Sequence, residues 1–442
     1  MALGGGTFTT QNKVLPGAYV NVVSASRASA TLGDRGVVAM PIALSWGNSG
    51  EVITVTAEEF IKNSMKIFGY SYDAAEMQPF REVFKHAQKV HVYNLADGTG
   101  HAKASCNYCT AKKAGVVGNE MMVVIQKNID DESKFDVSLV LQRWVSDSSG
   151  NMKSVTYTLD EQTVASVFEL TDNDYVTWNT ETDLAVTAGT PLINGGDGKV
   201  DSLSYQNVLN TLESYNYNML ICPDASAIDL YVAFTKRMRD NVGVKFQTVI
   251  PAVTDPDYEG VVQLPEVQAG AIYWAAGALA GCAINKSCTN MLYDGELTLS
   301  CLHTQSELET CIQDGVFVFH KVEDETRVLV DINSFVSVTD EKNELFSSNQ
   351  TIRVIDERSN TTASIFNTKY LGKVQNDASG RVSFWGDLVT HAKQMESMRA
   401  IETYDTESLT VEQGEKKGSV VTNEALTIIG TMEKLYLTSK IN

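Results

Sequence analysis

The clearest signal of fold class lies in SYQNVLNTLESYNYNMLICPDASAIDLYVAFTKRMRDNVGVKFQTVIPA, residues 204–252. Two helix-like patterns, 204–215 and 227–243, alternate here with two short apolar runs of strand length, NMLICP and FQTVIPA. Helices and strands that alternate at this spacing are typical of a parallel or mixed sheet covered by helices. The sequence therefore predicts an α/β core domain over residues 195–339.

Two earlier regions have different patterns. Residues 24–95 contain helix and strand signals, among them a helix that begins after the N-cap candidate Thr56, and we assign them to the N-terminal part of the core domain. Residues 96–194 carry short alternating runs such as FDVSLVLQRWVS, separated by turn residues such as SSGN. This second pattern predicts an all-β domain, a β-sandwich inserted into the core.

The C-terminal part is predicted to be an α+β domain followed by an arm. Residues 340–420 include a helical stretch, SGRVSFWGDLVTHAKQMESM, whose apolar pattern contains Phe384, Leu388 and Met395. Residues 421–442 form the C-terminal arm, and the polar segment from Gly414 to Gly418 is expected to be its flexible joint. An N-terminal arm, residues 1–23, precedes the body.

Both arms have the period of a half-buried β-strand. The last residues, TMEKLYLTSKIN, place apolar side chains two positions apart, at Leu435, Leu437 and Ile441. The first arm contains AYVNVVS, with Ala18, Val20 and Val22 on one face. Chain ends fray unless a partner holds them, so the sequence raises the question of what these strands pair with.

Composition limits the function classes. The 442 residues include 43% hydrophobic residues, enough for several packed domains, and carry a net charge of −20. This acidic balance argues against a nucleic-acid-binding surface spread over the chain. An odd number of cysteines, seven, and an N-terminus without a signal-peptide pattern favour free thiols in a reducing cytoplasm.

The longest uncharged stretch, AGAIYWAAGALAGCAI, covers residues 269–284. It is shorter than the roughly 20 residues that a membrane-spanning helix needs. Its Ala and Gly content favours a helix packed closely inside the protein, and no membrane insertion is expected.

No sequence signature of catalysis or of a bound cofactor is found. The CNYC motif, Cys106 and Cys109, allows a zinc or a redox interpretation, but a structural zinc site needs four ligands, so two ordinary thiols are favoured. GGDGK lacks the spacing of a phosphate-binding loop, and neither G-x-S-x-G nor H-E-x-x-H occurs. Acidic clusters such as IDDES lack EF-hand spacing. We therefore predict no catalytic residue, no cofactor, no metal and no enzymatic activity.

Several strings, taken in order, resemble those of contractile tail sheath proteins of myophages and phage-tail-like bacteriocins. They are LPGAYVNVVS, AKKAGVVGNEMMVVI, LTDNDYVTW with LAVTAGTPLINGGDG, YEGVV, AGAIYWAAGALAGCAINKSCTN, VDINSFVS and YLGKVQNDASGR. Each is a weak match by itself, and together they cover most of the chain.

This resemblance implies a structural subunit of a contractile sheath. It implies a core of subtilisin-like architecture without a catalytic triad and an outward-facing β-sandwich. It also implies self-assembly into a helical stack of hexameric rings around a tail tube protein, with baseplate and tail terminator proteins as further partners. The subunit would be assembled in the host bacterial cytoplasm and would reside in the virion tail, where contraction drives the tube through a cell envelope.

The resemblance also answers the question about the arms, because terminal strands of such sheaths join the sheet of a neighbouring subunit. The residues expected to make this inter-subunit strand exchange are Tyr19, Val20, Val22, Leu435, Tyr436, Leu437 and Ile441. Two alternatives stay open, an α/β hydrolase-like enzyme with an appended β-sandwich and a tail adhesin.

Overall fold

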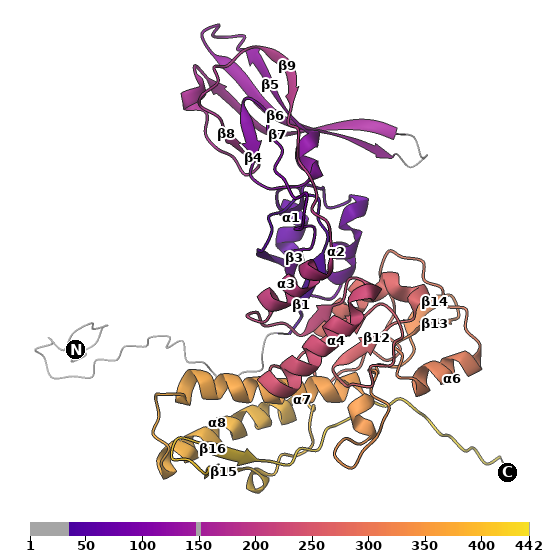
Figure 1. Ribbon diagram of the computed structural model, residues 1–442. Helices are drawn as coiled ribbons and strands as arrows, with labels where there is room; N and C mark the ends of the chain where they lie inside the picture. The colour runs from indigo at the N-terminus through magenta and orange to yellow at the C-terminus, as the bar shows by residue number, and fades with distance from the viewer. Residues whose placement is uncertain (1–34, 147–151, 442) are drawn as a thin grey trace, which may run out of the picture. The chain divides into compact units, whose positions relative to one another are not determined.

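The computed structural model describes residues 35–146 and 152–441 (Figure 1). The predicted N-terminal arm, including Tyr19, Val20 and Val22, lies outside the described residues. The described residues form two compact units. One contains residues 35–360 together with the returning segment 428–441, and the other contains residues 361–427.

The core of the larger unit is a six-stranded mixed sheet with the order β12-β11-β10-β1-β3-β2. Its first five strands are parallel, and β2 alone runs antiparallel, against β3. The strands are β1 (Val37–Ile42), β2 (Val52–Thr56), β3 (Lys89–Asn94), β10 (Met219–Ile221), β11 (Gln247–Ile250) and β12 (Val261–Gln263). This arrangement confirms the mixed α/β domain.

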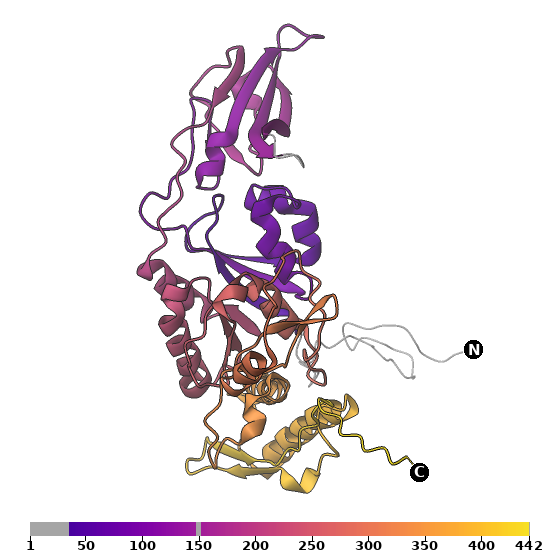
Figure 2. The same cartoon turned by 90° about the vertical axis from the view of Figure 1, so that its right-hand side faces the viewer.

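Both faces of this sheet are covered by helices, as a parallel sheet requires. Alternate residues of β1 enter different cores: Val38 and Met40 join one hydrophobic cluster, and Ala39 joins another. The first cluster includes residues of α1 (Ala57–Phe68), α2 (Gln78–Val83) and α5 (Ile272–Gly281). The second includes residues of α3 (Ser202–Leu212) and α4 (Ile228–Lys236), which can be followed in Figure 2.

Local sequence explains where one of these helices begins and how closely two others approach each other. Thr56 caps α1, as the sequence predicted, and forms a capping box with Glu59. α5 lies so close to α2 that a Cβ atom at Gly277 would be 2.3 Å from the carbonyl oxygen of Val83. The small-residue stretch 269–284 therefore contains a core helix, α5, packed at short range against α2. Among the described residues, no helix combines the length and the apolar character needed to cross a membrane.

The inserted β domain contains two sheets. A four-stranded antiparallel sheet has the order β7-β6-β5-β9, with β5 (Met121–Lys127), β6 (Phe135–Ser146), β7 (Met152–Val164) and β9 (Thr187–Pro191). The second sheet pairs β4 (Cys109–Ala111) with β8 (Val176–Trp178). Alternate residues of β5, namely Met121, Val123 and Ile125, are fully buried in the core that the two sheets share. This confirms the β-sandwich.

The rest of the larger unit contains α6 (Gln305–Gln313) and the hairpin of β13 (Phe319–Val322) and β14 (Glu325–Val328). Helix α7 (Asn349–Ile365) begins in this unit, and its last residues belong to the other. The smaller unit also contains α8 (Ala378–Ser397), on which Phe384, Leu388 and Met395 are buried as predicted.

The structure corrects one prediction about the arm. The segment from Gly414 to Gly418, expected to be a flexible joint, is the turn of a hairpin between β15 (Thr410–Gln413) and β16 (Val420–Asn423). The Gly414 N–H donates to the carbonyl oxygen of Ser419 at 2.9 Å and closes this turn. Residues 421–423, assigned to the arm, are therefore part of a sheet within the same chain. The polar composition of the turn concealed the strand pairing on either side of it.

Candidate functional site

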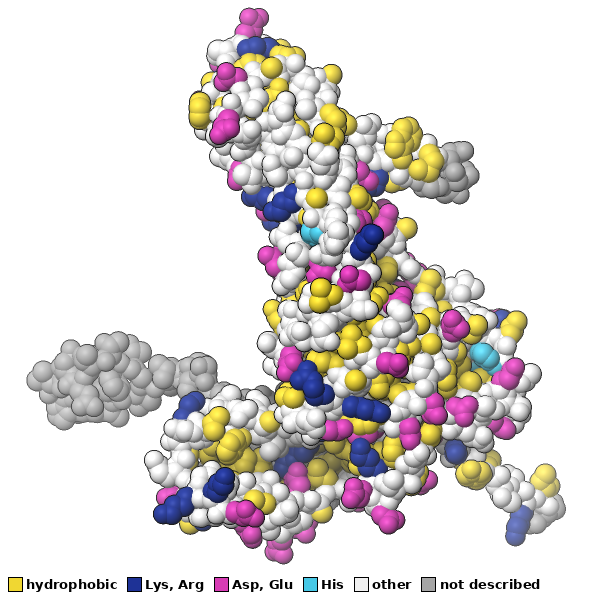
Figure 3. Space-filling model, in the orientation of Figure 1, with side chains coloured by type: hydrophobic (Ala, Val, Ile, Leu, Met, Phe, Trp, Pro, Cys, Tyr) yellow, Lys and Arg dark blue, Asp and Glu magenta, His cyan; other side chains and the backbone are white. Residues whose placement is uncertain are grey.

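The end of the chain is the most exposed apolar segment among the described residues. Leu435, Tyr436, Leu437 and Ile441 are 88%, 89%, 79% and 97% exposed. Residues 431–441 contain neither helix nor strand, and apolar side chains lie uncovered along them (Figure 3). The predicted strand is thus not formed within the chain itself, and its pairing with another copy stays a prediction.

The root of this segment, by contrast, is fastened to the core unit. The buried side chain of Gln350 donates from Nε2 to the carbonyl oxygen of Ile429 at 3.0 Å and accepts at Oε1 from the N–H of Thr431 at 3.1 Å. Farther along, the hydroxyl of Thr289 donates to the carboxylate of Glu433 at 3.2 Å. We call these three contacts the arm clasp. The Gln350 amide binds the backbone of the arm as a neighbouring strand would, through one hydrogen-bond donor and one acceptor.

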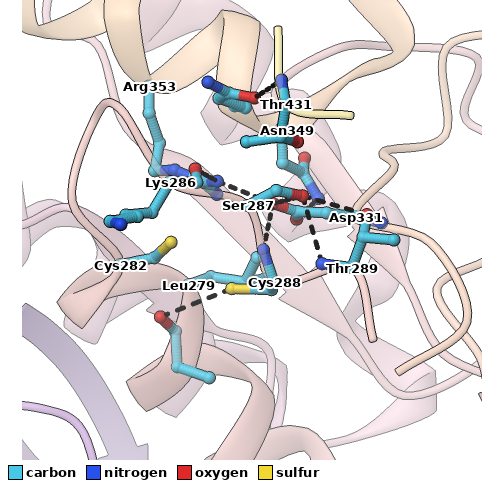
Figure 4. Close-up of polar contacts among 12 residues, drawn as sticks. Leu279, Cys282, Lys286, Ser287, Cys288, Thr289, Asp331, Asn349, Arg353 and Thr431 are labelled. Carbon is cyan, nitrogen blue, oxygen red and sulfur yellow. Dashed lines mark hydrogen bonds and ion pairs between the residues drawn. The ribbon is translucent and has the colours of Figure 1, made fainter. Parts of the chain in front are cut away.

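Thr289 belongs to a tight turn, Ser287-Cys288-Thr289, that follows α5 in the sequence (Figure 4). The N–H of Thr289 donates to the Ser287 hydroxyl at 3.1 Å. The N–H of Cys288 donates to the Asp331 carboxylate at 2.9 Å, and the N–H of Asp331 donates to the Thr289 hydroxyl at 3.0 Å. Because the Thr289 oxygen accepts from Asp331, its own hydrogen is directed to Glu433.

The Asp331 carboxylate is the centre of this network. One oxygen pairs with the Arg353 guanidinium at 2.6 Å, and the other accepts from the Asn349 amide at 3.0 Å. Arg353 also donates to the carbonyl oxygen of Lys286 at 2.9 Å. The Arg353 and Asp331 side chains are 2% and 1% exposed. The ion pair is therefore shielded from water, and removal of either side chain would leave the charge of the other buried without a counter-charge.

The electrostatics of the network follow from this burial. Burial alone would lower the pKa of Arg353, but the adjacent Asp331 carboxylate raises it overall. A second arginine, Arg35, donates to the carbonyl oxygens of Cys282 and Leu279 at the C-terminal end of α5. Burial, and then repulsion from Arg353, lowers the pKa of Arg35 to about 10. Both guanidinium groups are charged at neutral pH and hold backbone carbonyls in place.

No group of three or more His, Cys, Asp or Glu side chains among the described residues is placed to hold a metal ion. Cys106 and Cys109 lie with their sulfur atoms 3.8 Å apart as free thiols.

The sequence pattern identified the apolar residues of the C-terminal arm, but it did not predict the arm clasp. Gln350, Asp331 and Arg353 lie far apart from the arm in sequence, and no local pattern links an amide at 350 to a backbone at 429–431. One signal was available: the string KSCTN, residues 286–290, belongs to the family resemblance and contains the turn that the network stabilises.

Four family models match consecutive parts of the chain. They describe the tail sheath protein Gp18 domain III N-terminal region (residues 35–95), the phage tail sheath protein beta-sandwich domain (98–197), the phage tail sheath protein central domain (198–334) and the phage tail sheath C-terminal domain (341–442).

Individual relatives agree with these models. The phage-like element PBSX protein XkdK of Bacillus subtilis is 30% identical over 376 residues, which cover 76% of each chain. The crystal structure of a sheath tail protein from Desulfitobacterium hafniense has a TM-score of 0.77 at 32% identity and covers 95% of this chain and 99% of its own. The contracted helical sheath of the anti-feeding prophage has a TM-score of 0.55, covers 97% and 99%, and at 8% identity shares the fold alone.

An α/β core, an inserted β-sandwich and an exposed terminal arm fastened at its root define a multidomain structural subunit. The order of these domains along the chain agrees with the four matched family models. The chain belongs to the phage tail sheath protein family. It is a structural subunit of a contractile tail sheath, and the hydrolase and adhesin alternatives are not favoured.

Proposed function

We propose that the subunit polymerises by lending its C-terminal arm as a β-strand to another copy. The observation that carries this proposal is the contrast along the arm. Its root is held by the clasp at Ile429, Thr431 and Glu433, whereas the apolar residues Leu435 and Leu437 are exposed. An exposed segment of strand period is an aggregation hazard unless a partner covers it.

The hairpin β15–β16 is the acceptor we favour. It forms a sheet of two strands only, and among the described residues no third strand pairs with either edge. A strand added in trans gains main-chain hydrogen bonds, and alternate side chains supply specificity. Five such bonds at about 1 kcal/mol net each would make one exchange worth several kcal/mol. A contact that joins unlike surfaces of identical copies generates a helix rather than a closed dimer.

The wider role follows from membership in the family. We infer hexameric rings stacked around a tail tube protein, with baseplate and tail terminator proteins as partners and assembly in the host bacterial cytoplasm. The second arm, with Tyr19, Val20 and Val22, would make the complementary exchange. The core would keep a subtilisin-like architecture without enzymatic activity, with the β-sandwich over residues 96–194 facing outward. Contraction would move subunits as near-rigid bodies while the exchanged strands keep them linked.

Truncation of the arm tests the proposal. A chain that ends at Thr431 keeps Gln350 and its two partners, so its circular dichroism and thermal unfolding should match those of the full chain. Electron microscopy should show tubes for the full chain and only single subunits for the truncated one. The matched pair is Leu437→Pro and Leu437→Ala: proline removes a backbone donor and should abolish tubes, whereas alanine keeps the donor and should weaken them. Normal tubes from the truncated chain would refute the strand exchange.

A further inference from the structure

We propose that Cys106 and Cys109 are a redox site, a dithiol that a small-molecule disulfide such as oxidised glutathione converts into an intramolecular disulfide. This goes beyond the role in assembly and does not depend on it. The two sulfur atoms are 3.8 Å apart, in van der Waals contact, where β4 of the β-sandwich begins.

The backbone around the pair is already in a geometry that a disulfide accepts. The Cys106 N–H donates to the Cys109 carbonyl oxygen at 2.9 Å, and Ser105 pairs with Thr110 in an antiparallel bridge. The two cysteines therefore face each other across a two-residue turn. Directly opposed, hydrogen-bonded residues have Cα atoms about 5.5 Å apart, within the range that disulfides span. The bond can close by rotation of the side chains.

Neighbouring residues hold this turn in place. The backbone N–H of Asn179 donates to the Tyr108 carbonyl oxygen at 2.7 Å, and its side-chain amide donates to the Asn107 carbonyl oxygen at 3.0 Å. Both central residues of the turn are thus fixed from outside by one residue that follows β8. A rigid turn keeps the sulfur atoms together whether they are reduced or oxidised.

The two thiols differ in a way that assigns their roles. Cys106 is half-buried, whereas Cys109 is fully buried in the core of the sandwich. A hydrogen bond from the Cys109 thiol, with backbone N–H groups of Tyr108 and Cys109, lowers the pKa of Cys106 to about 6. The same contact, with burial, raises the pKa of Cys109. Cys106 is the thiol with the lowered pKa and the one that solvent reaches, so its thiolate attacks first.

The exchange balances in two steps. The Cys106 thiolate attacks one sulfur of oxidised glutathione, forms a mixed disulfide and releases one glutathione thiolate. Cys109 then loses its proton to solvent and attacks the Cys106 sulfur, and the second glutathione thiolate leaves. Counted from the Cys106 thiolate and the Cys109 thiol, the protein loses two electrons and one proton, and the two released glutathione thiolates take up protons from solvent to give two molecules of reduced glutathione.

A second pair of neighbouring cysteines, Cys282 and Cys288, lies in a different environment. Cys288 is fully buried, its thiol lies 3.8 Å from the Ala278 carbonyl oxygen, and its backbone is held by Asp331. Cys282 lies beside it, at the end of α5, with its carbonyl oxygen bound by Arg35. Cys282 is half-buried, but Cys288 is built into the buried network of the core, so closing a disulfide between them requires that network to open. Selective oxidation of Cys106 and Cys109 is therefore expected.

Thiol counting with oxidised glutathione tests the proposal on the full chain. The untreated protein should show seven thiols after denaturation and the treated protein five, with mass spectrometry locating the new bond between Cys106 and Cys109. Reduced glutathione in excess should restore all seven.

Two single variants separate the roles. Cys109→Ser should trap glutathione as a stable mixed disulfide on Cys106, because the second attacking thiol is absent. Cys106→Ser should acquire neither an adduct nor a disulfide in the sandwich. Seven thiols after treatment, a new bond at Cys282 and Cys288 alone, or a stable adduct on Cys106 of the unaltered chain would each overturn the proposal. None of these results depends on whether tubes form.

Discussion

The side-chain amide of Gln350 closes two hydrogen bonds with the backbone on either side of residue 430, and one of them is donated by the N–H of Thr431. Gln350 lies in the second position of α7, so a rigid helix fixes where the C-terminal arm leaves the core. The arm clasp converts a chain end that would fray into one with a defined direction.

Replacement of Gln350 by leucine should release the root of the arm. Hydrogen exchange of the Thr431 amide should accelerate roughly fivefold or more, since each lost hydrogen bond is worth about 1 kcal/mol. Gln350→Glu is the matched variant: it keeps the acceptor for Thr431 but loses the donor to Ile429, so its Thr431 amide should stay more protected. Equal exchange in all three proteins would show that the clasp does not hold the arm in solution.

Asp331→Asn should destabilise the core unit strongly. It leaves the Arg353 guanidinium buried without its counter-charge, a change that typically costs about 3–5 kcal/mol. Urea unfolding followed by tryptophan fluorescence measures this loss. Lys62→Ala is the control, because the Lys62–Glu58 pair is 66% and 75% exposed, and its removal should change the free energy of unfolding by less than about 1 kcal/mol. Similar losses in both variants would contradict the central place given to Asp331.

Gly277→Ala and Gly386→Ala should have opposite effects on folding stability. A methyl group at Gly277 meets the Val83 carbonyl oxygen at 2.3 Å and must force α5 away from α2, whereas nothing lies within 4 Å of one at Gly386 in α8. The first should lower the unfolding temperature of the larger unit, and the second should stabilise its helix by up to about 1 kcal/mol. Calorimetry measures both. A neutral Gly277→Ala would contradict the short helix–helix distance.

Lys113 should make stability depend on pH. Its ammonium donates to the Ile67 carbonyl oxygen at 2.7 Å near the end of α1, and burial lowers its pKa from 10.5 to about 8. Between these values the unfolded chain binds more protons than the folded one, so this group makes the protein more stable as pH rises from 8 to 10.5. The free energy of unfolding of the unaltered chain should therefore rise over this range relative to that of Lys113→Met. A constant difference would show that Lys113 titrates normally.

Local sequence patterns predicted many helices and strands of this fold, but they did not predict the contacts between residues far apart in the sequence. The capping box of Thr56 and Glu59 and the buried pattern of Phe384, Leu388 and Met395 depend on neighbours within a few residues, so they could be read from the sequence. The β15–β16 hairpin was missed because its turn is rich in Gly and Lys and resembles a linker. Gln350 was missed because an amide in a helix has many ordinary roles, and only tertiary structure brings Thr431 to it.

The path of the chain has a mechanical consequence. The polypeptide leaves the larger unit at residue 360 and re-enters it at 428, and Gln350 and Thr289 anchor it there before the exposed arm begins. Tension applied to the arm by a neighbouring copy would then reach the six-stranded sheet and its helices first. The smaller unit, residues 361–427, would not bear that force, so its β15–β16 hairpin would stay free to accept the arm of one copy while the sheet resists the tension applied by another.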